Sequence, residues 1–204
     1  MKTEFVDFSS NKLIEALHND EVIAFPTETV YGLGCIYDLK KAYDRLVEIK
    51  KRPPNKPFTL MGGRDFDFND FAYLDDNILK VIKKYVPGPI TLLLKAKENL
   101  PYQVSLNTSK IGIRISSNKL LEDFIYRVGK PLLVPSANIS SFPPLVTEKE
   151  VYDVFKNQIP YIVKSSFTPS KPSTIVDLSI PNEISLIRQG ELNFEDIKRT
   201  FKGE

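Results

Sequence analysis

The amino-acid sequence predicts an α/β or α+β protein built on one sheet of mixed strand direction with flanking helices. Short β-prone apolar runs alternate with segments of helical apolar spacing along the whole chain, and several late strands are joined by short hairpin-like connections. No internal repeat, low-complexity tract or long linker divides the 204 residues. We therefore expect a single domain over residues 1–204.

The first half of the chain contains three predicted helices, each bounded by a capping or breaking signal. Ser9 and Ser10 precede a helix that runs to about His18, and a second helix over residues 39–49 stops before a pair of prolines. A third helix over 75–86 ends at Pro87-Gly88-Pro89. Strands are expected at residues 22–25 and 58–61.

The second half is predicted to supply most of the sheet. Thr147 and Glu150 match a capping box at the start of a helix over 147–155, and further helices are expected at 120–128 and 194–201. Arg114 lies in an alternating strand, opposite that strand's apolar face. The other expected strands cover residues 90–94, 111–115, 132–134, 159–163, 173–178 and 184–187.

Composition narrows the class of protein. Hydrophobic residues make up 42% and charged residues 26% of the chain, which suits a packed core. The net charge of +2 does not by itself require a nucleic-acid partner, so a basic site must be local. Cys35 is the single cysteine, and the sequence has neither a signal peptide nor a run of about 20 apolar residues. We expect a cytoplasmic protein without membrane association.

Residues 24–34, AFPTETVYGLG, combine a strand with a polar and glycine-rich sequel. Pro26 ends the apolar run, and Thr27, Glu28 and Tyr31 follow before two glycines. The glycines allow a tight turn or a close approach of the backbone to a ligand. This pattern is typical of the rim of a binding cleft, and the alternative is an ordinary corner between two strands.

The densest group of cations lies in residues 50–57, KKRPPNKP. Such a run is usually a solvated helix end, but the prolines favour a stiff loop that presents Lys50, Arg52 and Lys56. On a non-helical backbone, a lysine two positions before an arginine could bind a polyphosphate together with it. The lysine would act as a point charge, and the arginine would donate two parallel hydrogen bonds.

Polar side chains also fall at the ends of several predicted strands, where open sheets place their ligands. Ser136 and Asn138 share one side of an extended segment, although both are also common in turns. Hydroxyls recur in residues 170–174, SKPST, and Arg188 follows a late strand.

Several chemistries are excluded by residue content. One histidine, His18, and one cysteine build neither a zinc site nor a catalytic relay, and neither phosphate-binding glycine motif occurs. What remains is chemistry carried by cations, hydroxyls and Mg²⁺, such as phosphoryl or nucleotidyl transfer.

The chain resembles YrdC/TsaC-type threonylcarbamoyl-AMP synthases over about residues 10–200. The resemblance rests on several motifs in the family's order: residues 25–34, the Lys50-x-Arg52-Pro53 element with Lys56-Pro57, Pro87-Gly88-Pro89-Ile90-Thr91, Ser136-Ala137-Asn138 and residues 172–177, PSTIVD.

The resemblance implies a single twisted sheet with a concave, basic cleft. It also implies a nucleotidyltransferase activity, in which L-threonine, bicarbonate and ATP with Mg²⁺ give threonylcarbamoyl-adenylate and pyrophosphate for the t6A modification of tRNA. Downstream t6A-pathway transferases and double-stranded RNA or tRNA are the implied macromolecular partners. By this resemblance Lys50 and Arg52 are catalytic. ATP is held by Lys50, Arg52, Lys56, Ser136, Asn138 and Arg188, and threonine by Thr27, Tyr31, Arg114, Ser173 and Thr174.

Two departures from the family pattern affect this expectation. Ser140-Ser141 stands where a glycine is common, and Met61-Gly62-Gly63 stands where some members have a histidine. Two other functions remain open. The first is a double-stranded RNA or tRNA-binding module without catalysis. The second is a carbamoyl-adenylate domain like those of hydrogenase-maturation proteins, which occur in longer chains with metal-binding fingers.

Overall fold

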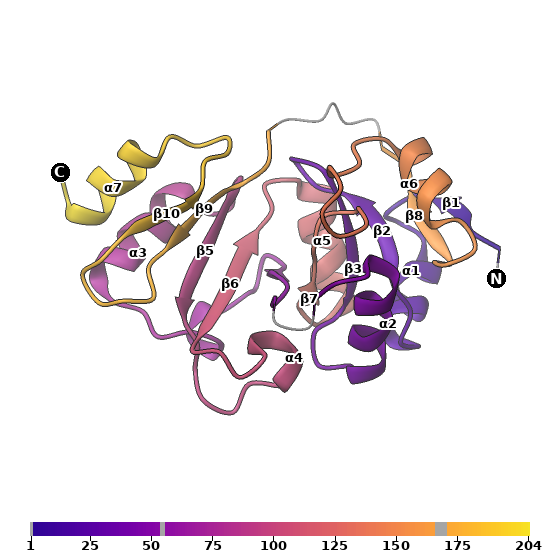
Figure 1. The fold of residues 1–204 in the computed structure, drawn as a ribbon, viewed down its shortest axis with the longest axis horizontal. Coiled ribbons are helices and arrows are strands. Elements are labelled where there is room, and N and C mark those ends of the chain that lie inside the picture. The colour runs from indigo at the N-terminus through magenta and orange to yellow at the C-terminus, as the bar shows by residue number, and fades with distance from the viewer. Residues whose placement is uncertain (1, 54–55, 166–170) are drawn as a thin grey trace.

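The computed structural model describes residues 2–53, 56–165 and 171–204, and ten strands in these ranges form one sheet (Figure 1). The strand order is β1-β8-β2-β3-β7-β4-β6-β5-β9-β10, and both parallel and antiparallel pairs occur. The predicted mixed sheet with flanking helices is confirmed. The strands are β1 Glu4–Val6, β2 Ile23–Pro26, β3 Tyr31–Ile36, β4 Leu60–Gly62, β5 Ile90–Lys95, β6 Lys110–Ile115, β7 Leu132–Leu133, β8 Tyr161–Val163, β9 Thr174–Asp177 and β10 Ser185–Arg188.

Every helix expected from the sequence is present. Thr147 and Glu150 form both halves of the predicted capping box, whereas Ser10 occupies an N-cap position without a side-chain cap bond. The short elements β1, η1 and α4 were not predicted, because three or four residues give no readable period. The helices are α1 Asn11–His18, α2 Lys40–Lys50, η1 Phe68–Asp70, α3 Asp76–Tyr85, α4 Tyr102–Ser105, α5 Lys119–Val128, α6 Glu148–Phe155 and α7 Phe194–Lys202.

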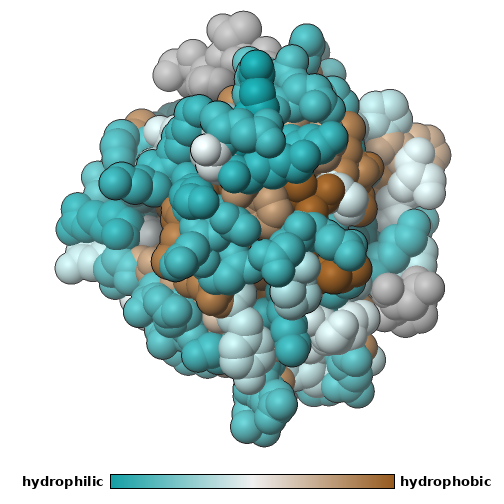
Figure 2. Space-filling model, turned by 90° about the vertical axis from the view of Figure 1, so that its left-hand side faces the viewer, coloured by the Kyte–Doolittle hydropathy of each residue, from teal (hydrophilic) through white to brown (hydrophobic). Residues whose placement is uncertain are grey.

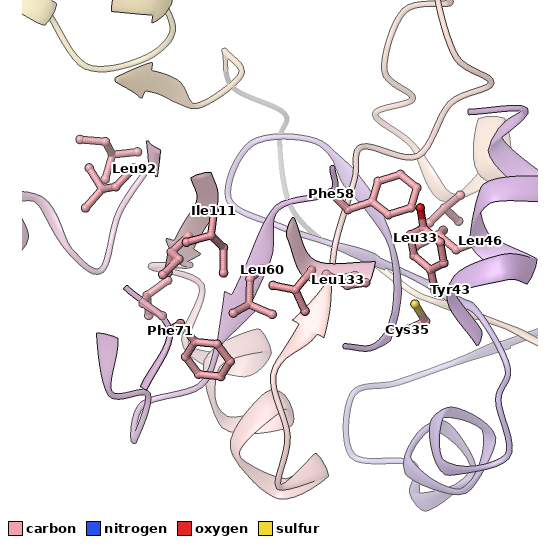
Figure 3. Close-up of a cluster of buried hydrophobic side chains, with 14 of the residues drawn as sticks. Leu33, Cys35, Tyr43, Leu46, Phe58, Leu60, Phe71, Leu92, Ile111 and Leu133 are labelled. Carbon is pink, nitrogen blue, oxygen red and sulfur yellow. The ribbon is translucent and has the colours of Figure 1, made fainter. Parts of the chain in front are cut away.

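The sheet buries apolar side chains on both faces, because neighbouring residues of a strand point to opposite sides. One face packs against α1 and α5 and includes Phe25, Leu132 and Phe124. The other face packs against α2, α3, α6 and α7, and part of its core, including Leu60 and Leu133, is drawn in Figure 3. The helices thus cover the second face along most of its length, whereas α1 and α5 cover only part of the first.

The β2–β3 hairpin corrects one expectation about residues 24–34. Gly32 and Gly34 lie inside strand β3 and pair with Phe25 and Ile23, so they do not form the turn. A Cβ atom on Gly32 would lie 2.7 Å from Val134 Cγ1, and one on Gly34 would overlap the ring of Phe25. The glycines are therefore required for side-chain packing across the hairpin, and residues 27–30 make the turn.

Strand β10 is one edge of the sheet and is held by antiparallel pairing with β9. Its Leu186 and Ile187 are exposed, and Figure 2, which views this end of the molecule, shows apolar residues within a mainly hydrophilic surface. Arg188 ends this strand. Within the described ranges, no helix is long and apolar enough to span a membrane. The cytoplasmic location stays a prediction.

Candidate active site

Cross-strand register builds the floor of one cleft on the face of the sheet that α1 and α5 cover in part. Met61 of β4 pairs with Arg114 of β6, Thr91 of β5 pairs with Ile175 of β9, and Ile175 pairs with Arg188 of β10. The register of β5 with β6 places Thr91 and Arg114 beside each other. All five residues line a cavity of about 190 Å³. The floor is thus a row of side chains from five strands.

The turn at residues 27–30 forms one wall of this cleft, and its own hydroxyls hold it in shape. Thr27 Oγ1 donates to the Val30 carbonyl at 2.7 Å and accepts from the backbone N–H of Thr29 at 3.1 Å. The Thr27 and Thr29 hydroxyls are 3.0 Å apart. The Thr27 hydroxyl therefore makes its hydrogen bonds within the turn and stabilises the conformation of this wall.

An ion pair joins this turn to the floor. Arg114 Nη2 lies 2.9 Å from Glu28 Oε1 and donates to Thr29 Oγ1 at 2.9 Å. Glu28 Oε2 accepts a hydrogen bond from the hydroxyl of Ser116. The Arg114 side chain is only 9% exposed and that of Glu28 11%, so the pair is shielded from bulk water.

Tyr31 also lines the cleft, directly after the turn. Its hydroxyl donates to the Val163 carbonyl at 2.9 Å, and its backbone carbonyl accepts from the Ala137 N–H. Burial, together with the charge of Glu148, raises the pKa of the Tyr31 hydroxyl above its usual range. The phenol therefore stays neutral, and its hydroxyl is directed to the backbone of β8.

Arg52 forms part of the opposite wall. Its Nε donates to the Lys56 carbonyl at 3.1 Å and its Nη2 to the Pro57 carbonyl at 3.0 Å. The guanidinium carbon lies 5.1 Å from the centre of the Phe58 ring. These contacts fold the side chain over its own loop and against an aromatic face, where a cation is stabilised. Burial lowers the pKa of Arg52 from its ordinary value, and the group remains a cation.

The structure corrects the expectation that Lys50 presents its ammonium from a non-helical loop. Lys50 is the last residue of α2 and is 1% exposed, and it does not line the cleft. Its Nζ donates to the carbonyls of Ser136 at 2.6 Å and Asn138 at 2.8 Å, and lies 3.2 Å from Asn138 Oδ1. Burial, followed by the charge of Arg52, lowers the pKa of Lys50 to about 7.

Ser136 and Asn138 lie on the same side of their segment, as predicted, but they converge on Lys50. Ser136 Oγ donates to Asn138 Oδ1 at 2.6 Å, and Asn138 Nδ2 donates to the carbonyls of Ile139 and Phe142. Ser136 lines the cleft, whereas the buried Asn138 does not. Asn138 therefore shapes the loop that presents Ser136.

The end of the cleft near β10 is closed by a second arginine. Arg188 donates from Nε and Nη2 to the Ser173 carbonyl, at 3.1 and 2.8 Å, and from Nη2 to Ser173 Oγ at 3.0 Å. Ser173 Oγ also lies 3.1 Å from Thr91 Oγ1. Burial and the nearby charge of Arg114 lower the pKa of Arg188 from its ordinary value. The guanidinium groups of Arg114 and Arg188 therefore lie close enough in the cleft to repel each other.

Thr174 is placed away from the cleft, because strand alternation points it to the opposite face from Ile175. Its hydroxyl donates to the Leu192 carbonyl at 2.7 Å and accepts from the N–H groups of Gly190 and Leu192. Thr174 therefore fixes the loop after β10. Lys56 is exposed and does not line the cleft either.

Seven of the predicted site residues line the one cleft, namely Thr27, Tyr31, Arg52, Arg114, Ser136, Ser173 and Arg188. Their contacts with substrates stay predictions. Pro54, Asn55 and Ser170, which belong to two of the predicted segments, lie outside the described residues.

The sequence assigned no site role to several further residues. Thr29, Thr59, Met61 and Thr91 also line the cleft, and Glu28 and Ser116 support it from behind. Thr91 could have been found from strand alternation, because this polar residue lies on the opposite face of its strand from the buried Ile90 and Leu92.

No protein cage for a divalent metal is present in the described ranges, since no three His, Cys, Asp or Glu side chains cluster there. The Glu28 carboxylate, which is close to the cleft, is engaged by Arg114 and Ser116. A magnesium ion commonly keeps its waters and binds substrate phosphates. Mg²⁺ that arrives with ATP stays a prediction.

Comparison with known proteins shows the same fold in solved structures. The chain aligns with P. abyssi Sua5 complexed with L-threonine at a TM-score of 0.86 and 27% identity, covering 98% of this chain and 59% of that one. It aligns with E. coli YciO at a TM-score of 0.82 and 24% identity, covering 96% and 98%. The chain therefore spans less than two thirds of P. abyssi Sua5.

Curated relatives are more similar in sequence. A protein of Buchnera aphidicola named threonylcarbamoyl-AMP synthase is 35% identical over 167 residues, or 79% of this chain and 94% of its own length. A protein of the same name from Pseudoalteromonas atlantica is 35% identical over 160 residues, or 76% and 84%. A family model described as telomere recombination, which groups Sua5, YciO and YrdC, matches residues 15–190. The chain belongs to the Sua5/YciO/YrdC family.

Proposed function

We propose that this chain is a threonylcarbamoyl-AMP synthase, a nucleotidyltransferase that joins L-threonine, bicarbonate and ATP into threonylcarbamoyl-adenylate and pyrophosphate. One observation carries the proposal. A single cleft brings Thr27, Tyr31 and Arg114, predicted to hold threonine, together with Arg52 and Ser136, predicted to hold ATP. The name of the relatives and the threonine complex of Sua5 support the same activity.

The reaction does not need a nucleophile from the protein. The amine of threonine attacks CO₂, forms the new C–N bond and loses a proton to give a carbamate. A carbamate oxygen then forms a bond to the α-phosphorus of ATP, while the bond from that phosphorus to the bridging oxygen breaks and pyrophosphate leaves with the electron pair. This agrees with the cleft, whose lining includes hydroxyls and guanidinium groups but neither Cys35 nor His18. Positioning of the two substrates supplies the rate.

The arginines of the cleft match the charge that develops in this reaction. Negative charge accumulates on the leaving pyrophosphate, and a guanidinium that already points at that position stabilises it without reorganisation. Arg52 and Arg188 line the cleft on its two sides, and both are held by backbone carbonyls. Mg²⁺ would accompany ATP as part of the substrate and neutralise phosphate oxygens.

The further parts of the proposal concern the product and partners. Threonylcarbamoyl-adenylate would be consumed by a transferase that modifies tRNA beside the anticodon, and the basic side of the cleft would also suit a tRNA or double-stranded RNA backbone. Arg52 and Arg188 could meet such phosphates as well as those of ATP.

Pyrophosphate release measured with each substrate left out in turn tests the activity. We expect release that requires threonine, bicarbonate and ATP together, and that falls when serine replaces threonine. Double-stranded RNA is titrated in parallel over a series of salt concentrations. RNA affinity that falls steeply with salt, with no pyrophosphate formed, would replace this proposal by a binding module without catalysis.

A further inference from the structure

We propose that Glu28 is a positioning residue for the amino-acid substrate. In this proposal, its carboxylate fixes the Arg114 guanidinium in the orientation that receives the substrate's carboxylate, and Ser116 fixes Glu28 in turn. The inference rests on the proposed function, since it assumes that the ligand beside Arg114 is an amino acid. It adds a role for two residues that do not themselves line the cleft.

The contacts of Arg114 show how its orientation is set. Its Nη2 lies 2.9 Å from Glu28 Oε1 in an ion pair and donates a hydrogen bond to Thr29 Oγ1, also at 2.9 Å. Thr29 is fully buried and its hydroxyl is 3.0 Å from that of Thr27. A guanidinium is planar, so an ion pair and a hydrogen bond at one nitrogen, together with the side chain's own stem, restrict the orientation of the group. Arg114 thus has little freedom to turn within the cleft floor.

Glu28 is itself held from the side away from the cleft. Ser116, which is fully buried, donates its hydroxyl to Glu28 Oε2 and accepts a hydrogen bond from the Asn118 N–H at 3.2 Å. Asn118 is the N-cap of α5 and accepts from the N–H groups of Leu120 and Leu121. A series of hydrogen bonds therefore runs from the start of α5 through Ser116 to Glu28, and the ion pair between Glu28 and Arg114 extends it to the cleft.

One hydrogen-bond donor of Arg114, its Nε, is left for a ligand. Its Nε is buried and has no hydrogen-bond acceptor in the part of the chain that the structure describes, although Arg114 lines the cleft. A buried N–H without a partner is costly, and an oxygen brought by a ligand would satisfy it. A carboxylate suits this position because a guanidinium binds it with two parallel hydrogen bonds.

The local charge agrees with a monoanionic group. Arg114 and Arg188 lie close enough that the first lowers the pKa of the second. Glu28 is the carboxylate that pairs with Arg114. Together these three side chains carry a net charge of +1, so this end of the cleft attracts an anionic group of a substrate. Glu28 thus lets two guanidinium groups share a cleft floor and keeps one of them correctly oriented.

Substitution of Glu28→Gln tests the proposal, because glutamine keeps the shape of the side chain and removes its charge. We expect KM for threonine to rise by roughly 10-fold to 100-fold, the effect of misplacing a binding group by about 1 Å. KM for ATP should stay within about twofold, because the hydrogen bonds that hold Arg52 and Ser136 are made with Pro57 and Asn138 and do not involve Glu28 or Arg114. Circular dichroism establishes that the variant is folded.

Two further variants keep the test decisive. Ser116→Ala removes one hydrogen bond to Glu28 and leaves the ion pair, so it should raise threonine KM by a smaller factor and likewise spare ATP KM. Asp123→Asn is the matched control, because it breaks an Arg–Asp pair of 2.8 Å with Arg64 that is exposed and outside the cleft. It should leave both KM values unchanged.

Combining Glu28→Gln with Arg114→Lys measures the coupling. If Glu28 acts through Arg114, the double variant should have nearly the threonine KM of Arg114→Lys alone. An unchanged threonine KM in Glu28→Gln, or equal rises in threonine and ATP KM, would overturn the inference. So would fully additive effects in the double variant. Absence of threonine-dependent pyrophosphate release in the unmodified protein would instead overturn the proposed function.

Discussion

The two walls of the cleft handle charge in opposite ways. On the turn side, Arg114 is paired with Glu28 yet lines the cleft, and its buried Nε has no acceptor among the described residues. On the basic side, Lys50 is buried beneath the loop, where the carbonyls of Ser136 and Asn138 accept from its ammonium. Lys50, the most buried cation of the basic segment, therefore stabilises the loop and does not line the cleft.

This difference separates two roles that the sequence motif combines. Lys50 and Arg52 are two positions apart, but one ends a helix and points inward, whereas the other lies in the loop and lines the cleft. Lys50 also accepts the Ser140 N–H at its backbone carbonyl. It thus holds the loop by both its main chain and its side chain, and Arg52 is left to meet the substrate.

Arg52→Ala should produce the largest loss of activity. Removal of a guanidinium that stabilises the leaving pyrophosphate is expected to lower kcat by about 10²-fold to 10³-fold. The free energy of unfolding should change little, because the hydrogen bonds of Arg52 are to carbonyls within its own loop. Pyrophosphate release and circular dichroism measure the two quantities. A fully active Arg52→Ala protein contradicts the role of this residue.

Lys50→Met should mainly affect stability. It leaves the carbonyls of Ser136 and Asn138 buried without their donor, which is expected to cost about 2 kcal/mol in the free energy of unfolding. KM for ATP should also rise, because the Ser136 loop is no longer fixed. Urea denaturation provides the measurement. Unchanged stability with complete loss of activity would instead indicate that Lys50 binds the phosphates of ATP directly.

The pH dependence of stability gives a separate test of Lys50. Its pKa is lowered from 10.5 to about 7 in the folded protein. Between about pH 7 and pH 10.5 the unfolded chain binds the extra proton, so stability rises with pH in this window, by up to about 1.4 kcal/mol per pH unit. Below pH 7 both states are protonated, so Lys50 no longer makes stability depend on pH.

Lys50→Met removes this titration and keeps every other one. The stability difference between the unmodified protein and Lys50→Met should therefore grow from about pH 7 to about pH 9. Urea midpoints at a series of pH values provide the measurement. A difference that stays constant with pH contradicts the lowered pKa.

Thr174→Val should have the smallest effect. The substitution removes hydrogen bonds to Leu192 and Gly190, and we expect a loss of about 1–2 kcal/mol in the free energy of unfolding. Threonine KM should change by no more than about twofold, since the side chain points away from the cleft. A large rise in threonine KM at normal stability would support the substrate contact that the family resemblance implies.

Much of the fold could be predicted from the sequence, because apolar periodicity and capping signals are local. The capping box at Thr147 and the strand containing Arg114 are examples. The roles of Lys50 and Thr174 could not be predicted. Each depends on which way a side chain points relative to a partner far along the chain, as in the 86 residues between Lys50 and Ser136.

The Glu28–Arg114 pair shows the same limit. Both residues were noticed in the sequence, but their contact requires the register that sets β6 beside β4 and β5. The motifs predict seven residues that line the cleft. Only the sheet register shows which of these side chains lie beside one another.

Mass spectrometry of the product made from threonine, ATP and ¹³C-labelled bicarbonate tests the central claim most directly. We expect the mass of threonylcarbamoyl-adenylate, with the label retained in the product and far less adduct when serine replaces threonine. Formation of pyrophosphate without a labelled adenylate, or no nucleotide product at all, would contradict the account of one cleft that joins an amino acid to ATP.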